Sequence, residues 1–175
     1  MSDSAPSEQD SERWDAAQVG ADLLTEGLAD EAARELEALV ARDPDNEYAW
    51  FFLGSVRYEQ ERYADAMRAY VRALECKPEY PGAMLHLGHT MRMLGHHAHA
   101  IRLGKQLLAR NAEDPDALYL LGTASFAHGD DAAARGYLER FVATRPEPEA
   151  MIEATGMLQV LRGEVLQATP SDDPD

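Results

Sequence analysis

Cysteine is almost absent from this sequence, and long apolar runs are missing altogether. The 175 residues include one cysteine, Cys76, which cannot form an internal disulfide, so a fold held together by disulfides is excluded. No apolar run approaches the roughly 20 residues that a membrane-spanning helix needs, and residues 1–12 lack the basic and apolar regions of a secretory signal. Because scarce cysteine also suits a reducing compartment, these absences predict a cytoplasmic protein.

Positive charge is scarce as well. The chain has 16 Lys and Arg residues against 32 Asp and Glu residues, which gives a formal net charge of -16. This balance argues against nucleic acid as a partner, because phosphates are bound by Lys and Arg, and against anionic membrane surfaces. An acidic surface favours solubility and, among protein partners, those with a basic segment.

Motifs that carry catalytic chemistry are also missing. The sequence has no Gly-rich phosphate loop, no paired-carboxylate motif and no nucleophile elbow. Cys76 stands among packing positions, and no histidine is placed near it to act as a base. We therefore expect no enzymatic activity and no cofactor.

Small residues recur at one fixed interval along the chain. A first glycine series keeps a single phase: Gly20, Gly54, Gly88, Gly122 and Gly156. Alanines, further glycines and prolines keep the same period: Ala32, Ala66, Ala100 and Ala134; Gly27, Gly95 and Gly129; Pro44, Pro78 and Pro146. Two helices cross closely only where side chains are small, a glycine in the left-handed conformation ends a helix, and proline follows a helix that stops. The series predict repeated helix hairpins.

The segment 47–80 shows the repeating unit most clearly. It carries a set of apolar and small residues at helical spacing: Trp50, Leu53, Gly54, Tyr58, Ala66, Tyr70 and Pro78. This pattern resembles the tetratricopeptide repeat, a unit of about 34 residues whose signature is Trp-x2-Leu-Gly-x2-Tyr, then Ala-x3-Phe, then Pro. Arg57 stands where the signature has its first tyrosine, and Tyr70 replaces the phenylalanine. The resemblance implies an all-α fold, a right-handed α-solenoid of four tetratricopeptide helix hairpins plus a C-terminal capping helix.

The repeat phase divides the chain. The repeats cover about 13–46, 47–80, 81–114 and 115–148, and a capping helix covers 149–167, where Glu153, Arg162 and Glu164 would form a polar outer face. In the third repeat Gly104 takes the place of a large residue, which predicts a shallow hole or entry of a neighbouring side chain. The acidic ends, 1–12 and 168–175, are rich in Ser, Asp and Pro and are expected to be disordered.

The resemblance also implies a binding surface, because the first helix of each hairpin lines the concave face of the stack in this family. The lining residues are then Tyr48, Phe51, Phe52, Ser55, Glu59, Leu85, His86, His89, Arg92, Asp116, Tyr119, Leu120 and Thr123. One branch of the family binds C-terminal carboxylates through Lys, Arg and Asn, and the corresponding places here include Ala17, Ala21 and Gly82. The groove therefore favours an apolar segment of a protein partner, which follows either an extended or a helical path.

Five of the six histidines fall in the third repeat. His86 and His89 have the i, i+3 spacing that a zinc site would use, but a third ligand on the same face is missing. We expect these two to be polar groove residues and His96, His97 and His99 to lie at a solvated turn, with a metal site as the weaker alternative.

Two functions suit such a groove. The first is an adaptor or assembly scaffold that holds a peptide of a partner. The alternative is a cytoplasmic chaperone for a secreted hydrophobic protein, because the size, acidity and aromatic groove resemble those of class II type III secretion chaperones. Those chaperones usually carry a longer helical segment before their repeats, and their repeats are degenerate. Here the first repeat begins near Arg13 and the second is close to consensus.

Overall fold

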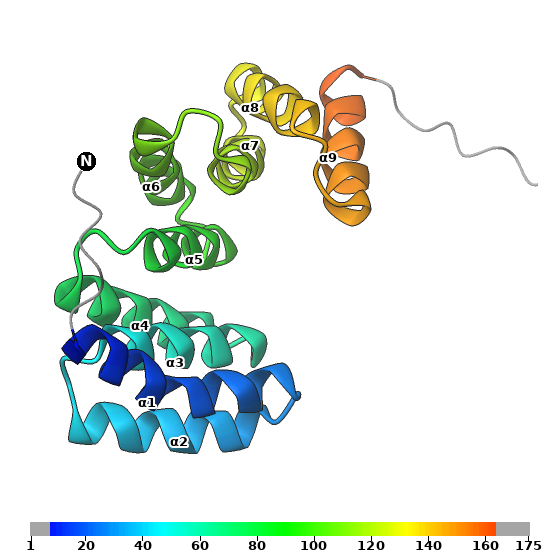
Figure 1. The fold of residues 1–175 in the computed structure, drawn as a ribbon. Helices are drawn as coiled ribbons and strands as arrows, with labels where there is room; N and C mark the ends of the chain where they lie inside the picture. The colour runs from blue at the N-terminus through cyan, green and yellow to red at the C-terminus, as the bar shows by residue number, and fades with distance from the viewer. Residues whose placement is uncertain (1–7, 164–175) are drawn as a thin grey trace, which may run out of the picture.

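A computed structural model describes residues 8–163, and within them it contains nine α-helices and no β-strand (Figure 1). The helices are α1 Glu8–Thr25, α2 Ala29–Arg42, α3 Glu47–Glu59, α4 Tyr63–Cys76, α5 Pro81–Met93, α6 His97–Arg110, α7 Pro115–His128, α8 Asp131–Ala143 and α9 Pro148–Leu161. They form a solenoid of four hairpins followed by a single helix, which confirms the predicted fold class. No helix among residues 8–163 combines the length and the apolar character required to cross a bilayer.

The N-terminal end differs from its prediction. Residues 8–12, expected to be disordered, belong to α1, whose first turn carries Glu8 and Asp10. Carboxylates are favourable there because the N-terminal end of a helix carries partial positive charge. The rest of the predicted N-terminal tail, the predicted tail 168–175 and the last residues of the predicted capping helix lie outside the described residues.

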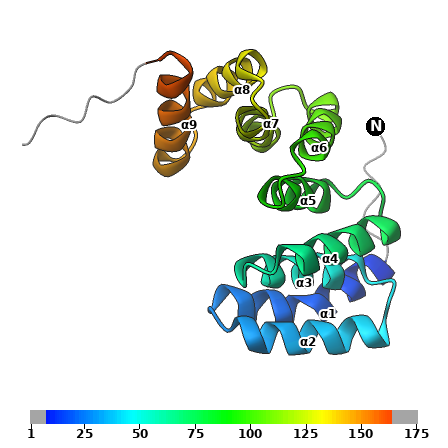
Figure 2. The same cartoon turned by 180° about the vertical axis from the view of Figure 1, so that it is seen from behind.

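The stack curves because its two sides are spaced differently. The first helices of successive hairpins contact one another, α1 with α3, α3 with α5 and α5 with α7, whereas second helices of successive hairpins do not. Closer spacing of the first helices bends the stack, so they lie on its inner side. Figures 1 and 2 show the resulting arc from opposite directions.

The turns inside the hairpins have the conformation that the sequence predicts. Gly27, Gly95 and Gly129 follow α1, α5 and α7 with φ values of 79°, 78° and 82°. Glu61 takes the corresponding place after α3 and has a φ of 57°, which is uncommon for a residue with a side chain. The second glycine series is therefore a series of left-handed helix ends.

The crossings inside the hairpins depend on the first glycine series. A Cβ on Gly54 would lie 2.6 Å from the Tyr70 ring, and a Cβ on Gly122 would lie 2.6 Å from Leu138. Both distances are far below van der Waals contact, so the large side chain of the second helix occupies the place that a Cβ would take.

The crossing of α5 and α6 in the third hairpin is packed differently. Gly104 stands where Tyr70 and Leu138 stand in the neighbouring repeats, and Leu120 and Leu121 of α7 occupy the space instead. A Cβ on Gly88 would lie 2.4 Å from Leu120, and a Cβ on Gly104 would lie 2.7 Å from Leu121. Of the two outcomes predicted at Gly104, the entry of a neighbouring side chain is therefore the one that occurs.

One face of helix α9 packs against the last hairpin, and the opposite face of α9 is exposed. Ala154 and Leu158 are buried in a cluster with Leu138 and Phe141. Glu153 and Arg162 are exposed, as predicted for a polar outer face, and Glu164 lies outside the described residues, but Ile152 and Val160 are also 72% and 63% exposed. Gly156 lies between these two residues along the helix, and no atom lies within 4 Å of the place its Cβ would take. Thus α9 resembles the first helix of a hairpin.

Two glycine substitutions should have opposite effects on stability. Gly54→Ala should lower the free energy of unfolding by about 1–3 kcal/mol, because its Cβ overlaps the fully buried Tyr70 ring. Gly136→Ala, in α8, meets no atom within 4 Å and should raise it by about 0.5–1 kcal/mol. Urea denaturation of both variants measures the difference. Equal effects at the two positions would contradict the crossing.

Removal of α9 should destabilise the last hairpin. A chain that ends at Glu147 exposes Leu138 and Phe141, which are at most 4% exposed when α9 is present. We expect a lower melting temperature, and aggregation measured by light scattering, because exposed apolar patches promote association. A truncated chain that stays monomeric and melts at the original temperature would show that α9 does not protect this cluster.

Candidate functional site

The inner face of the stack carries a series of aromatic rings in contact. The series runs from α1 through α3 to the start of α5 and comprises Trp14, Tyr48, Phe52, Phe51, Tyr80, Tyr70 and His86. Ring centroids are 5.1 Å apart for Trp14 and Tyr48, 5.7 Å for Trp14 and Phe52, and 5.2 Å for Phe51 and Phe52. The Phe51 centroid is 5.1 Å from that of Tyr80 and 5.2 Å from that of His86. We call these seven residues the inner aromatic surface; six of them are at least partly exposed, and the ring of Tyr70 is buried beneath them.

Phe51 and Phe52 serve different neighbours within this surface. Phe52 contacts Trp14 of α1, while Phe51 contacts Tyr70 and His86 further along the stack. Both are partly buried, so neither is wholly a core residue. Adjacent residues on a helix point in different directions, and here the two directions lead along the stack toward opposite ends.

A small hollow of about 190 Å³ adjoins the inner aromatic surface. Its lining residues come from α3, α4 and α5 and are Ser55, Tyr58, Glu59, Tyr70, His86 and His89. The Tyr70 hydroxyl donates a hydrogen bond to Ser55 Oγ at 3.2 Å, and burial raises its pKa. The hollow therefore offers polar atoms at the edge of an otherwise aromatic surface.

The two groove histidines are neutral at pH 7. Burial, followed by the nearby charges of Arg92 and His86, lowers the pKa of His89 to about 4. Burial also lowers the pKa of His86, although Asp116 opposes that shift. The His89 ring lies 6.1 Å from the ring of Tyr119. Arg92 Nε is buried and has no hydrogen-bond partner among the described residues.

The fourth repeat contributes less to the inner face than the sequence predicts. Tyr119 is half-buried, its ring packs 5.0 Å from Phe141, and its hydroxyl donates to Glu153 of α9. Leu120 and Thr123, predicted to line the groove, are 0% and 2% exposed and belong to the core.

Leu120 is buried because of the way the third hairpin is packed. The two glycines there, Gly88 and Gly104, leave space that Leu120 enters from α7. The Thr123 hydroxyl donates to the Tyr119 carbonyl at 2.9 Å and is thereby paired within its own helix. Two further residues of the third and fourth repeats were predicted to line the groove and are accessible: Leu85 is half-buried and Asp116 is exposed.

The remaining histidines lie away from the inner aromatic surface. The rings of His96 and His99 are 6.2 Å apart, and those of His97 and His128 are 6.5 Å apart. Across residues 8–163, no three His, Cys, Asp or Glu side chains are grouped as ligands of a metal ion. Cys76 is half-buried, its Sγ lies 3.6 Å from the Pro44 carbonyl, and burial raises the pKa of its thiol.

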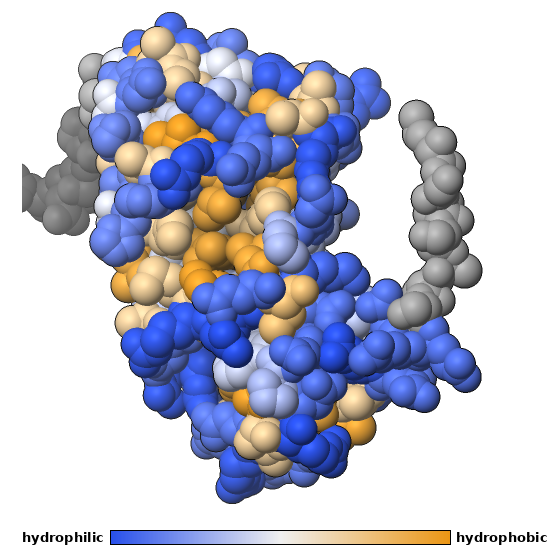
Figure 3. Space-filling model, turned by 90° about the vertical axis from the view of Figure 1, so that its left-hand side faces the viewer, coloured by the Kyte–Doolittle hydropathy of each residue, from blue (hydrophilic) through white to orange (hydrophobic). Residues whose placement is uncertain are grey.

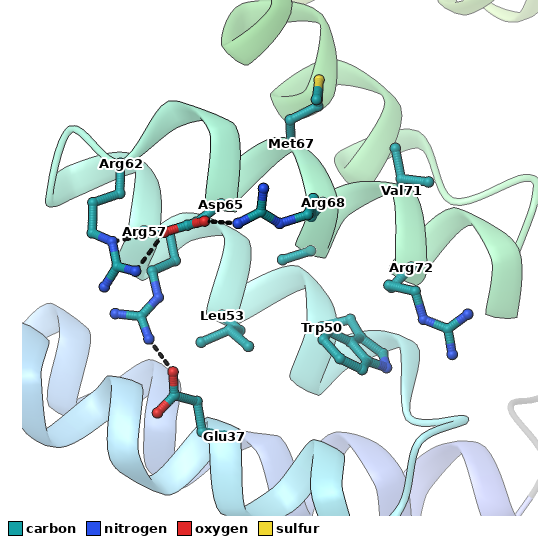
Figure 4. A pocket seen from close by; sticks show the side chains of 11 residues that line it. Glu37, Trp50, Leu53, Arg57, Arg62, Asp65, Met67, Arg68, Val71 and Arg72 are labelled. Atoms are coloured by element: carbon teal, nitrogen blue, oxygen red, sulfur yellow. Dashed lines mark hydrogen bonds and ion pairs between the residues drawn. The ribbon is translucent and has the colours of Figure 1, made fainter.

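Sequence patterns missed a second hollow, on the outer side of the hairpins. It is a groove of about 640 Å³ over α3, with α2 and α4 as its walls (Figure 4). Apolar side chains are also exposed elsewhere on the outer side. A view from the side on which α6 lies shows a band of apolar residues through the middle of the surface (Figure 3). Arg57 was the available signal, because it departs from the repeat signature at a place that lines this groove.

Stacked helix hairpins with these crossings and this inner face define a tetratricopeptide-repeat protein. A family model described as the cytochrome c-type biogenesis protein H TPR domain matches residues 21–152, so the chain belongs to that family. Cytochrome c-type biogenesis protein CycH of Pseudomonas aeruginosa is 32% identical over 143 residues, which cover 79% of this chain and 35% of that protein. The chain thus spans about a third of the length of this relative.

Solved structures share the fold at lower identity. A crystal structure of MamA has a TM-score of 0.73 at 21% identity and covers 83% of this chain and 84% of its own. The crystal structure of YrrB, described as a TPR protein with an unusual peptide-binding site, has a TM-score of 0.66 at 15% identity and covers 86% of each chain. These proteins support the solenoid architecture.

The lowered pKa of His89 predicts a loss of stability in mild acid. The unfolded chain binds a proton below its ordinary pKa of 6.5, whereas folded His89 binds one only near pH 4. The contribution of neutral His89 to the free energy of unfolding is therefore fully present above pH 6.5, and it is lost as the pH drops from 6.5 to 4. His89→Gln should reduce the stability difference between pH 7 and pH 4.5 by about 1–2 kcal/mol. Urea denaturation at both pH values measures this, and an unchanged difference would contradict a neutral, buried His89.

Proposed function

We propose that the inner aromatic surface binds an apolar segment of another protein and that the chain acts as an adaptor in the biogenesis of c-type cytochromes. One observation carries this proposal. Six rings, contributed by α1, α3, Tyr80 and α5, form one partly exposed surface on the concave side, and the buried ring of Tyr70 packs beneath them. Aromatic side chains are the groups that most often anchor a bound partner, because each removes a large apolar area from water.

The chemistry of this surface favours an apolar segment over a charged one. Its histidines are neutral at pH 7, and the charged predicted residues Glu59, Arg92 and Asp116 differ in sign. Arg92 is partly exposed, so its terminal N–H groups are available to donate to a backbone carbonyl of the bound segment. That donation would fix the orientation of the segment, while the rings supply most of the affinity.

The cytochrome assignment comes from the family and from the relative's name. Cytochrome c-type biogenesis protein CycH is about three times as long as the part it shares with this chain. The adaptor role suits a module that holds one protein near others and performs no chemistry itself. Because the matched family concerns cytochrome c biogenesis, we favour this role over that of a chaperone for a secreted hydrophobic protein.

Peptides derived from c-type cytochromes test the proposal. Overlapping synthetic peptides that cover an apocytochrome c should include at least one that binds the chain, measured by calorimetry. Phe52→Ala should weaken that binding about 30-fold, equivalent to about 2 kcal/mol. Moderate salt should change it little, because the contact is apolar.

A matched control comes from the outer groove. Val71→Ala truncates another exposed apolar residue, 37% exposed, on α4. It should leave peptide affinity unchanged. Equal losses in the two variants, or a Phe52→Ala variant that folds and binds like the original, would contradict binding at the inner aromatic surface. Binding of peptides unrelated to cytochromes alone would contradict only the cytochrome assignment.

A further inference from the structure

The groove on the outer side of the hairpins is distinct from the inner aromatic surface. Helix α3 separates the two, because Trp50, Leu53 and Arg57 lie on the side of α3 opposite to Phe52 and Ser55. We call this groove the outer groove. Its lining residues are Glu37, Trp50, Leu53, Arg57, Arg62, Asp65, Met67, Arg68, Ala69, Val71 and Arg72.

The floor of the outer groove is apolar and ordered. The Trp50 indole N–H donates to the Pro44 carbonyl at 2.8 Å, which fixes the ring. The Arg72 guanidinium lies 5.6 Å from the centroid of that ring. Leu53 lies beside Trp50 on this floor, whereas Met67 and Val71 line the groove from α4 and point away from these two residues (Figure 4). A bulky apolar side chain would therefore find its partners at Trp50 and Leu53.

The rim of the outer groove is positively charged, unlike the chain as a whole. Four arginines line the groove, which is a quarter of the 16 Lys and Arg residues in a chain with a net charge of -16. Two carboxylates line it with them. Asp65 pairs with both Arg62 and Arg68, and Glu37 pairs with Arg57. Arg72 pairs with Glu75, a residue of α4 that does not line the groove. One of the two guanidinium groups at Asp65 therefore remains uncompensated within the groove.

This combination is specific to the second repeat. The places of Trp50 and Arg57 carry Met84 and Met91 in the third repeat. The side chain of Arg57 is only 11% exposed, so it is held in the groove wall by its bonds to Glu37 and Gln60. The groove is thus an addition to the repeat framework at one position of the stack.

We propose that the outer groove is a second docking site, for a protein segment that carries a bulky apolar side chain flanked by Asp or Glu. The apolar side chain lies on the Trp50 floor, and its neighbouring carboxylates pair with the guanidinium groups of Arg62, Arg68 and Arg72. Charge complementarity selects this occupant, because an acidic protein repels other acidic segments except where arginines are concentrated. Arginine also binds carboxylates through two parallel hydrogen bonds, which adds geometric specificity.

Two short peptides test the chemistry directly. The probes are acetyl-Glu-Glu-Leu-Leu-Glu-Glu-amide and the same peptide with Lys in place of Glu. In an NMR titration of the full chain, the acidic peptide should shift the indole resonance of Trp50 and leave that of Trp14, on the inner aromatic surface, nearly unmoved. The basic peptide should shift Trp50 much less. An equal or stronger response of Trp50 to the basic peptide, or no response to either, would overturn the proposal.

Two charge reversals separate the outer groove from general electrostatics. Arg68→Glu should weaken binding of the acidic peptide about tenfold or more. Arg34→Glu changes the net charge equally, at the same place one repeat earlier and outside the groove, and should weaken it less than twofold. Equal losses in the two variants would show that only the overall charge matters. Phe52→Ala should leave this binding unchanged, so failure here is distinguishable from failure of the inner aromatic surface.

Discussion

The absence of a Cβ at one place in each hairpin is the constraint on which the rest of the structure depends. At Gly54 and Gly122 the side chain of the second helix fills the space that a Cβ would take, so the two helices approach closely. Close crossings that recur once in every repeat align the first helices along the stack. That alignment brings rings from three hairpins into contact, and it is the origin of the inner aromatic surface. A structure with wider crossings would place the same rings apart.

The sequence alone predicted those features that one repeat determines by itself. The hairpins follow from the periodic glycine and alanine series, and the left-handed turns follow from Gly27, Gly95 and Gly129. Phe51 and Phe52 were placed correctly on α3, since their positions depend only on the phase of one helix. These features need no knowledge of how neighbouring repeats fit together.

Features that arise between repeats were not predictable in the same way. Leu120 enters the core because the third hairpin lacks a large residue at Gly104, and a pattern within α7 carries no information about that space. The outer groove depends equally on side chains from three helices of two hairpins. Its floor includes Trp50, a signature residue that the repeat pattern treats as core. Side-chain volumes across a repeat boundary decide such cases, and periodicity does not record them.

The open crossing at Gly156 bears on how a protein of this kind changes in length during evolution. Helix α9 keeps the glycine of a hairpin while Ile152 and Val160 remain exposed beside it. One further helix with a large apolar side chain at the place equivalent to Leu138 would complete a hairpin there, and the four existing hairpins would keep their contacts. The length of the concave surface is thus a quantity that duplication can adjust one whole repeat at a time, independently of the chemistry already present on each repeat.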